Sequence, residues 1–259
     1  KKRVVRALSL LVVGMVTFLS VFRCTDINTL AYNSNYSAKS LGVFYSHYYN
    51  TKLFIEESLL EDDILTDEDK TAIIEFYKNK SSKFTDNRLN GIAKGKNLIV
   101  VQMEAMQQFV INRKIGGKEI TPNLNKLIKE CLYFDNIYYQ VSGGNTSDAE
   151  FLSNTSMYPV KEGSVYHRFA ENTYYSLASI MKEQGYDTYS LHGFDRYFWN
   201  RDEMYKSLQF DTFYSEENFV LDDFAGWDGQ ALSDSSFFRQ SLEKIDTAKP
   251  FYSFFVTLS

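Results

Sequence analysis

The alternation of strand-like and helix-like segments that begins at Asn97 constrains the fold most. Apolar runs typical of buried strands occur at 98–103, 132–138, 187–191, 210–214 and 251–258. Helical patterns lie between them, at 122–129, 147–152, 172–184 and 228–245. Such alternation predicts a mainly parallel sheet flanked by helices. Ligands bind such sheets at the carboxyl ends of the strands, so the residues after each strand are the candidates for function.

A glycine-rich loop leads directly into the helix expected at 147–152. Residues 142–147 read SGGNTS. Glycines let the backbone approach a bulky anion, and the N-terminus of the next helix presents N–H groups and a positive dipole end to a phosphate. We therefore interpret Thr146 as a nucleophile that needs activation by a base or a metal. The same residue types are also typical of a simple turn and helix cap.

Glu104 comes directly after the apolar run at 98–103. A carboxylate at the end of a buried strand is costly to bury unless it has a partner, and a metal ion is a natural one. The alternative is a glutamate that points into solvent or pairs with a lysine. Glu104 is therefore a candidate metal ligand.

The strand expected at 187–191 is followed by side chains that suit a phosphate. Arg201 can clamp a phosphate with two hydrogen bonds, and His192 can donate a hydrogen bond or transfer a proton. Trp199 offers a flat wall to a polyol or a lipid headgroup. Each residue type alone is more often structural, but together at strand ends they predict a phosphate site.

The N-terminal segment predicts a membrane helix. Basic residues at positions 1, 2, 3 and 6 precede an apolar run at 7–22. With its flank, this run approaches the roughly 20 residues that span a bilayer. The basic flank places the N-terminus inside, so that everything after residue 24 lies on the outer face. A buried helix of a soluble protein is the alternative.

Residues 25–96 predict a polar, aromatic-rich connector. Short helices are expected at 41–49 and 54–60, and a third begins after Thr66, where capping residues precede a 3.6-residue apolar pattern. The formal net charge of −5, without a basic patch, excludes nucleic acid as the expected partner.

Four motifs, taken in order, resemble the lipoteichoic acid synthase family of the alkaline phosphatase and sulfatase superfamily. They are NLIVVQME at 97–104, TPNL at 121–124, GNTSDAEF at 144–151, and HG with FWNR between 192 and 201. The resemblance divides the chain into the last transmembrane helix at 1–24, an extracellular connector at 25–96 and the N-terminal part of a sulfatase-like catalytic domain at 97–259.

The resemblance implies an enzyme of lipoteichoic acid synthesis and cell wall biogenesis, with its catalytic part outside a bacterial cell membrane. Thr146 would attack phosphatidylglycerol and release diacylglycerol, and the glycerol phosphate would pass from the threonine to a growing polyglycerolphosphate chain. Glu104 and Thr146 would bind manganese or magnesium. His192, Trp199 and Arg201 would hold the glycerol phosphate.

The sequence departs from the family pattern in one respect. An Asp-His pair of metal ligands and a further substrate histidine come later in the family, and this sequence contains no Asp-His pair. We interpret the sequence as truncated at its C-terminus and expect this fragment alone to be inactive.

Three other functions remain open at this point. A sulfatase-like hydrolase would need a Cys/Ser-x-Pro-x-Arg pattern, which is absent around Thr146. A phosphoethanolamine transferase would use a similar threonine and differ in its headgroup contacts. A membrane-anchored binding or sensor protein would keep the fold without catalysis.

Overall fold

A computed structural model describes residues 12–14, 42–55, 65–81, 89–161, 163–225 and 231–258. Tyr32–Lys96 forms one compact unit, and Asn97–Ser259 belongs to a second. The predicted membrane helix at 1–24 lies outside the described residues except for 12–14, which are helical. Among the described residues, no helix is both long enough and apolar enough to cross a membrane.

The first unit contains helices α3 (Val43–Ile55) and α4 (Asp67–Ser81). The start of α4 confirms the capping prediction, because Thr66 Oγ1 donates to Asp69 Oδ2 at 2.5 Å and the Asp69 N–H donates to Thr66 Oγ1 at 3.1 Å. Helix α3 covers most of the helix expected at 41–49 and continues to Ile55. Most of the helix expected at 54–60 lies outside the described residues.

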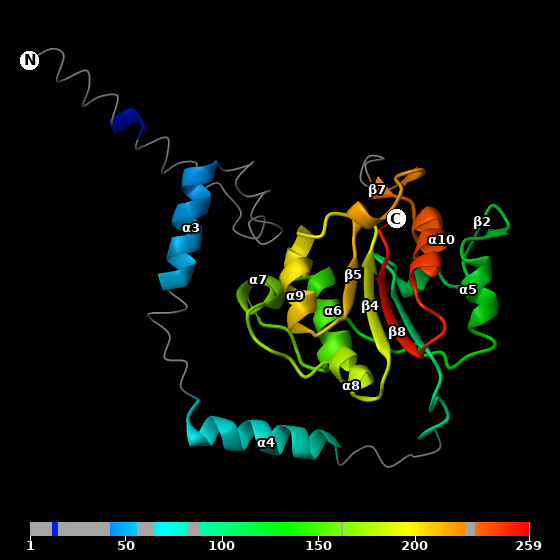
Figure 1. Ribbon diagram of the computed structural model, residues 1–259, viewed down its shortest axis with the longest axis horizontal. Helices are drawn as coiled ribbons and strands as arrows, with labels where there is room; N and C mark the ends of the chain where they lie inside the picture. Colours follow the sequence, from blue (N-terminus) through cyan, green and yellow to red (C-terminus); the bar gives the residue numbers. More distant parts are fainter. Residues whose placement is uncertain are drawn as a thin grey trace, which may run out of the picture. The chain divides into compact units, whose positions relative to one another are not determined.

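A four-stranded parallel sheet forms the centre of the second unit (Figure 1). Its strands, in spatial order, are β1 (Leu98–Gln102), β8 (Phe251–Val256), β4 (Asp187–His192) and β5 (Thr212–Tyr214). Gln102 and His192 both pair with Val256, so the carboxyl ends of three neighbouring strands meet at one edge. The predicted parallel sheet is confirmed.

Helices cover both faces of this sheet (Figure 1). Those on one face are α6 (Thr146–Thr155), α7 (Val165–Arg168), α8 (Leu177–Glu183) and α9 (Arg201–Ser207), and α10 (Asp234–Lys244) lies on the other. Successive side chains of a strand point to opposite faces. Accordingly, Tyr252, Phe254 and Val256 of β8 join the first cluster of buried side chains, whereas Phe251 and Phe255 join the second.

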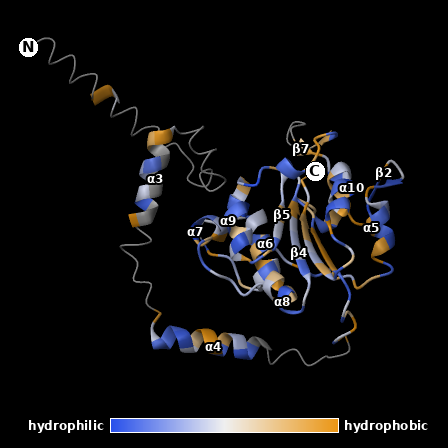
Figure 2. Cartoon of the chain, in the orientation of Figure 1, coloured by the Kyte–Doolittle hydropathy of each residue, from blue (hydrophilic) through white to orange (hydrophobic). Residues whose placement is uncertain are grey.

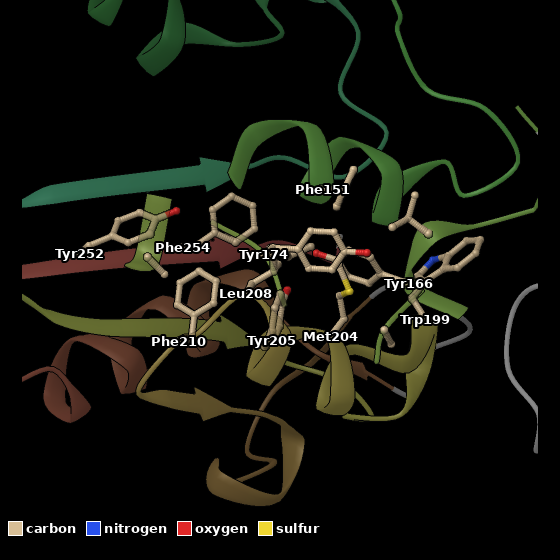
Figure 3. Packing of buried hydrophobic residues seen from close by; sticks show 14 residues of the cluster. Phe151, Tyr166, Tyr174, Trp199, Met204, Tyr205, Leu208, Phe210, Tyr252 and Phe254 are labelled. Atoms are coloured by element: carbon tan, nitrogen blue, oxygen red, sulfur yellow. The ribbon is translucent and has the colours of Figure 1, made fainter. Parts of the chain in front are cut away.

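The hydrophobic residues are concentrated on the central strands (Figure 2), and aromatic side chains dominate the larger cluster (Figure 3). All of β8 is buried. The edge strand β1 alternates instead, with Ile99 52% and Val101 41% exposed. The site therefore rests on a rigid central strand and a less covered edge strand.

The strand predicted at 132–138 is wrong. Residues 132–139 have no regular secondary structure, and several of their apolar side chains are more than 60% exposed, namely Leu132, Phe134, Ile137, Tyr138 and Tyr139. A strand needs a hydrogen-bonded neighbour as well as apolar side chains, and no described strand pairs with this segment.

Two predicted helices start later than expected. Helix α8 begins at Leu177 rather than near 172, because Ser176 caps it and its hydroxyl accepts a hydrogen bond from the Ser179 N–H. Helix α10 begins at Asp234 after the cap Ser233. Residues 226–230, part of the helix predicted at 228–245, lie outside the described residues.

Short elements connect this framework. The hairpin of β2 (Lys114–Ile115) and β3 (Lys118–Glu119) turns at Gly116 and Gly117, whose positive φ values of 57° and 81° suit glycine. The others are η3 (Gln108–Val110), α5 (Pro122–Leu127), η4 (Phe198–Asn200), η5 (Glu216–Asn218), β6 (Phe224–Ala225) and β7 (Ala231–Leu232).

We expect Tyr252→Phe to lower the free energy of unfolding by about 1–3 kcal/mol, because it leaves a buried acceptor unsatisfied. The Tyr252 hydroxyl donates to Asn154 Oδ1 at 2.8 Å, and both residues are buried. Urea unfolding followed by circular dichroism measures the change. Tyr175→Phe is the matched control because Tyr175 is 66% exposed. Equal midpoints for the two variants would contradict the prediction.

Candidate active site

Thr146 and Glu104 meet at the carboxyl edge of the sheet. Thr146 is the first residue of α6, and its Oγ1 donates to Glu104 at 2.9 Å from Oε2 and 3.2 Å from Oε1. Glu104 follows the end of β1 by two residues, and both side chains are half-buried. A carboxylate at this distance can orient a hydroxyl and accept its proton. The structure thus brings together two residues that the sequence singled out separately.

The loop before Thr146 is held by a buried carboxylate. Asp148 Oδ2 accepts hydrogen bonds from the N–H groups of Ser142 at 2.8 Å and Gly144 at 3.0 Å. Burial raises the pKa of Asp148 above its ordinary value, against the effect of these two bonds. A Cβ at Gly144 would lie 2.1 Å from Asp148 Oδ1. Glycine at this position is therefore required by the neighbouring carboxylate, a reason that the sequence alone did not reveal.

The backbone next to Thr146 is strained and anchored. Asn145 has φ 42° and ψ −106°, a conformation that costs of order 1–3 kcal/mol outside glycine. The Tyr139 hydroxyl donates to Asn145 Oδ1 at 2.8 Å, and Gln102 Nε2 donates to the Thr146 carbonyl at 3.1 Å. These contacts fix the start of α6 against the end of β1.

Thr257 positions Glu104 from the central strand. The Glu104 N–H donates to Thr257 Oγ1 at 2.9 Å, and the Thr257 N–H donates to the Gln102 carbonyl at 3.1 Å. Thr257 follows the last residue of β8 and is buried. Sequence reasoning assigned no role to Thr257 or Gln102, because their contacts exist only once the strands have paired.

His192 is the last residue of β4 and is buried. Its Nδ1 lies 3.0 Å from the Val256 carbonyl, and since a carbonyl only accepts, Nδ1 carries the proton. Burial, aided by the positive charge of Arg201, holds the pKa of His192 well below its usual range. The ring is therefore neutral. Its Nε2 is an acceptor with no partner among the described residues.

Trp199 and Arg201 lie in the interior of the unit. Trp199 is 2% exposed within the larger cluster, near Tyr166 in the view of Figure 3, and its φ of 58° is in the left-handed region. Arg201 is the first residue of α9 and is 1% exposed. The flat wall and the phosphate clamp expected from the sequence are thus covered side chains. Their contact with a substrate stays a prediction.

Glu150, which sequence reasoning missed, is the partner of Arg201. Arg201 Nη2 donates to Glu150 Oε1 at 2.6 Å, and Arg201 Nε donates to the same oxygen at 3.0 Å. The Tyr205 hydroxyl donates to Glu150 Oε2 at 2.6 Å. The signal available in the sequence was spacing, because Glu150 follows Thr146 by one helical turn.

Glu104 and Thr146 suit a divalent cation as two members of a larger ligand set. Their donor atoms are a carboxylate and a hydroxyl oxygen, the hard ligands that Mg²⁺ and Mn²⁺ prefer. Across the part of the chain that the structure describes, no group of three or more His, Cys, Asp or Glu residues is placed to hold a metal. The roles of Glu104 and Thr146 as cation ligands therefore stay a prediction.

Comparison with known proteins shows the family to which this chain belongs. Residues 96–259 match the sulfatase family model. Lipoteichoic acid synthase 2 of Bacillus subtilis (strain 168) is 35% identical over 237 residues, which are 90% of this chain and 36% of that protein. This chain therefore spans little more than a third of that relative.

Two solved structures share the fold. A lipoteichoic acid synthase from Listeria monocytogenes is 33% identical with a TM-score of 0.62, over 65% of this chain and 42% of that chain. A protein in the alkaline phosphatase superfamily from Vibrio parahaemolyticus is 25% identical with a TM-score of 0.51, over 62% and 40%. The mainly parallel sheet and its flanking helices thus form an alkaline-phosphatase-like fold.

The family resemblance drawn from the motifs around Glu104, Thr146 and Arg201 is confirmed by these matches. The family match covers more than half of the chain, and the relatives just described contain the same region. The chain belongs to the sulfatase family, and it is similar to the lipoteichoic acid synthases within it.

Proposed function

We propose that this chain is part of a phosphoglycerol transferase that moves glycerol phosphate from phosphatidylglycerol to a growing polyglycerolphosphate chain, in lipoteichoic acid synthesis. The observation that carries the proposal is the contact between Thr146 Oγ1 and Glu104 at the first turn of α6. Similarity to lipoteichoic acid synthases supports the choice of substrate. The enzyme would be anchored through residues 1–24 in a bacterial membrane, with its catalytic part outside.

The reaction would take two displacements at phosphorus. In the first, Thr146 Oγ1 forms a bond to the phosphorus, the bond to the diacylglycerol oxygen breaks, and the Thr146 proton passes to Glu104. Glu104 then passes that proton to the diacylglycerol oxygen as it leaves. In the second, a terminal glycerol hydroxyl of the growing chain attacks the glycerophosphoryl-threonine, the bond from phosphorus to Thr146 Oγ1 breaks, and the proton of the attacking hydroxyl passes to Thr146 Oγ1. The first turn of α6 favours the negative charge of the phosphate throughout.

Glu104 and Thr146 would hold the cation, manganese or magnesium. When bound, such an ion lowers the pKa of the Thr146 hydroxyl and stabilises charge on the phosphoryl oxygens. We propose that His192, Trp199 and Arg201 bind the glycerol phosphate. The neutral His192 would accept a hydrogen bond from a glycerol hydroxyl at Nε2, its unpartnered atom. This role differs from the hydrogen-bond donation or proton transfer expected from the sequence.

A headgroup comparison tests the proposal. We expect the protein, as expressed from its gene, to release diacylglycerol from phosphatidylglycerol vesicles at least about 10-fold faster than from phosphatidylethanolamine vesicles, since a site that hydrogen-bonds glycerol hydroxyls rejects analogues without them. Diacylglycerol is measured by mass spectrometry, with manganese present and with chelator as the control. Preference for phosphatidylethanolamine would replace the proposal with a phosphoethanolamine transferase. Hydrolysis of an aryl sulfate alone would indicate a sulfatase.

A further inference from the structure

A buried ion pair joins the helix of the nucleophile to the predicted phosphate-binding segment. Glu150 on α6 is 0% and Arg201 on α9 is 1% exposed. Fifty-one residues separate them in the sequence. A charge pair this far from water costs several kcal/mol per ion unless its hydrogen bonds are good. The hydrogen bonds of this pair are good, because the Glu150 carboxylate accepts from the Tyr205 hydroxyl as well as from Arg201.

The contacts of Arg201 use only part of its hydrogen-bonding capacity. A guanidinium has five N–H groups in a fixed fork. Glu150 occupies the edge formed by Nε and Nη2, and Nη1 donates to the Phe198 carbonyl at 3.2 Å. These hydrogen bonds use one N–H of Nη1 and one of Nη2, and each nitrogen keeps a second N–H. Two such groups are what a bidentate phosphate contact requires. The Tyr205 hydroxyl also interacts with the guanidinium and is the group that a phosphate would replace there.

We infer that Glu150 is a positioning residue, which holds the Nε–Nη2 edge of Arg201 so that the remaining N–H groups of Nη1 and Nη2 receive the substrate phosphate. The inference rests on the proposed function and goes beyond it. It assigns a role to Glu150, and it names the side of the Arg201 guanidinium that binds the phosphate. It also gives a reason why a charged residue lies inside the larger cluster.

Helix geometry links this pair to the nucleophile. Glu150 follows Thr146 by four residues on α6, so the two lie on one face, about 6 Å apart along the axis. Arg201 contacts α6 through Glu150, the residue one helical turn after Thr146. Any tilt of α6 would move Thr146 and Arg201 together. The phosphate would then meet both groups at a constant separation.

Because Arg201 is buried, it can bind a phosphate only if the groups around it move. At 1% exposure, the guanidinium meets a phosphate only after the groups that cover its free edge shift. An arginine released from its cover would ordinarily turn toward water. Glu150 prevents that, because it binds the opposite edge and needs no rearrangement when the phosphate arrives. Preorganised charge of this kind strengthens binding without an ordering cost.

Direct binding of glycerol phosphate, measured by calorimetry on the protein as expressed, separates positioning from a purely structural role. We expect Glu150→Gln to raise the Kd for glycerol phosphate about 10-fold. A neutral amide orients the guanidinium of Arg201 less firmly than the two oxygens of a charged carboxylate do. Tyr205→Phe should raise it by a smaller factor. Tyr252→Phe is the matched control, because it removes a different buried hydrogen bond to α6, the one to Asn154. Its Kd should equal that of the wild type.

A double-mutant cycle completes the test. Arg201→Lys should weaken binding in the wild type and have a smaller effect in the Glu150→Gln background, because the two residues act as one unit. Lower melting temperatures with an unchanged Kd for both Glu150→Gln and Tyr205→Phe would overturn the inference and leave the proposed function standing. Wild-type protein that does not bind glycerol phosphate would overturn both.

Discussion

Thr146→Ala is expected to abolish diacylglycerol release, with kcat lowered at least about a thousand-fold, as for removal of other catalytic nucleophiles. The neighbouring hydroxyl cannot take its place. Ser147 Oγ donates to the Gly144 carbonyl at 2.8 Å and lies 2.8 Å from Ser164 Oγ, in a fully buried position. The side chain of Ser147 therefore points into the packing of the loop. Glu104 would lose its hydrogen-bond donor at Thr146 as well.

The assay compares Thr146→Ala with two variants of the same helix. Ser153→Ala changes an exposed hydroxyl that donates to the Ala149 carbonyl, and it should retain wild-type turnover. Thr146→Ser keeps a hydroxyl without the methyl group and should retain partial turnover. A search for a phosphorylated peptide containing residue 146, trapped with phosphatidylglycerol alone, tests the covalent step. Undiminished diacylglycerol release by Thr146→Ala would exclude Thr146 as the nucleophile.

The framework of the catalytic unit was predictable because its strands are apolar throughout. Runs such as that at 251–258 leave few alternatives to a strand buried on both faces, and the structure confirms it as β8. The run at 132–138 has a similar composition and forms no strand. Its outcome depends on whether another strand lies beside it, and the local sequence contains no information on pairing. The start of α8 differs from the prediction for another reason: its cap, Ser176, lies inside the helical pattern at 172–184.

Some residues of the candidate site could likewise be predicted from the sequence, and others could not. Glu104 and Thr146 could be chosen from the sequence because each stands where chemistry is expected, at a strand end and at a helix start. The burial of Arg201 could not be foreseen, since its partner Glu150 lies on a helix 51 residues earlier in the chain. A sequence identifies an arginine as a phosphate ligand by type. Only the packing reveals that three of the four hydrogen bonds of this arginine go to a carboxylate.

Gly144→Ala should impair both folding and turnover, because the new methyl group has no space. Its carbon would lie 2.1 Å from Asp148 Oδ1 and 2.9 Å from Ser147 Oγ. Asp148 would have to move and give up its bonds to the N–H groups of Ser142 and Gly144. Overpacking of this kind costs about 1–3 kcal/mol of unfolding free energy. A displacement of Thr146 by about 1 Å should lower turnover about a hundred-fold.

Two other glycines give the matched series. Gly143→Ala brings a carbon 2.9 Å from the Gly163 carbonyl, whereas Gly193→Ala makes ordinary contacts of 3.4 Å or more with Phe237. None of the three glycines has a positive φ, so the three substitutions differ in the space available for the new methyl group and not in backbone strain. We expect the loss of stability in urea and of diacylglycerol release to follow the order Gly144, Gly143, Gly193. If Gly144→Ala is as stable and active as Gly193→Ala, then the Asp148 carboxylate does not hold the loop of the nucleophile.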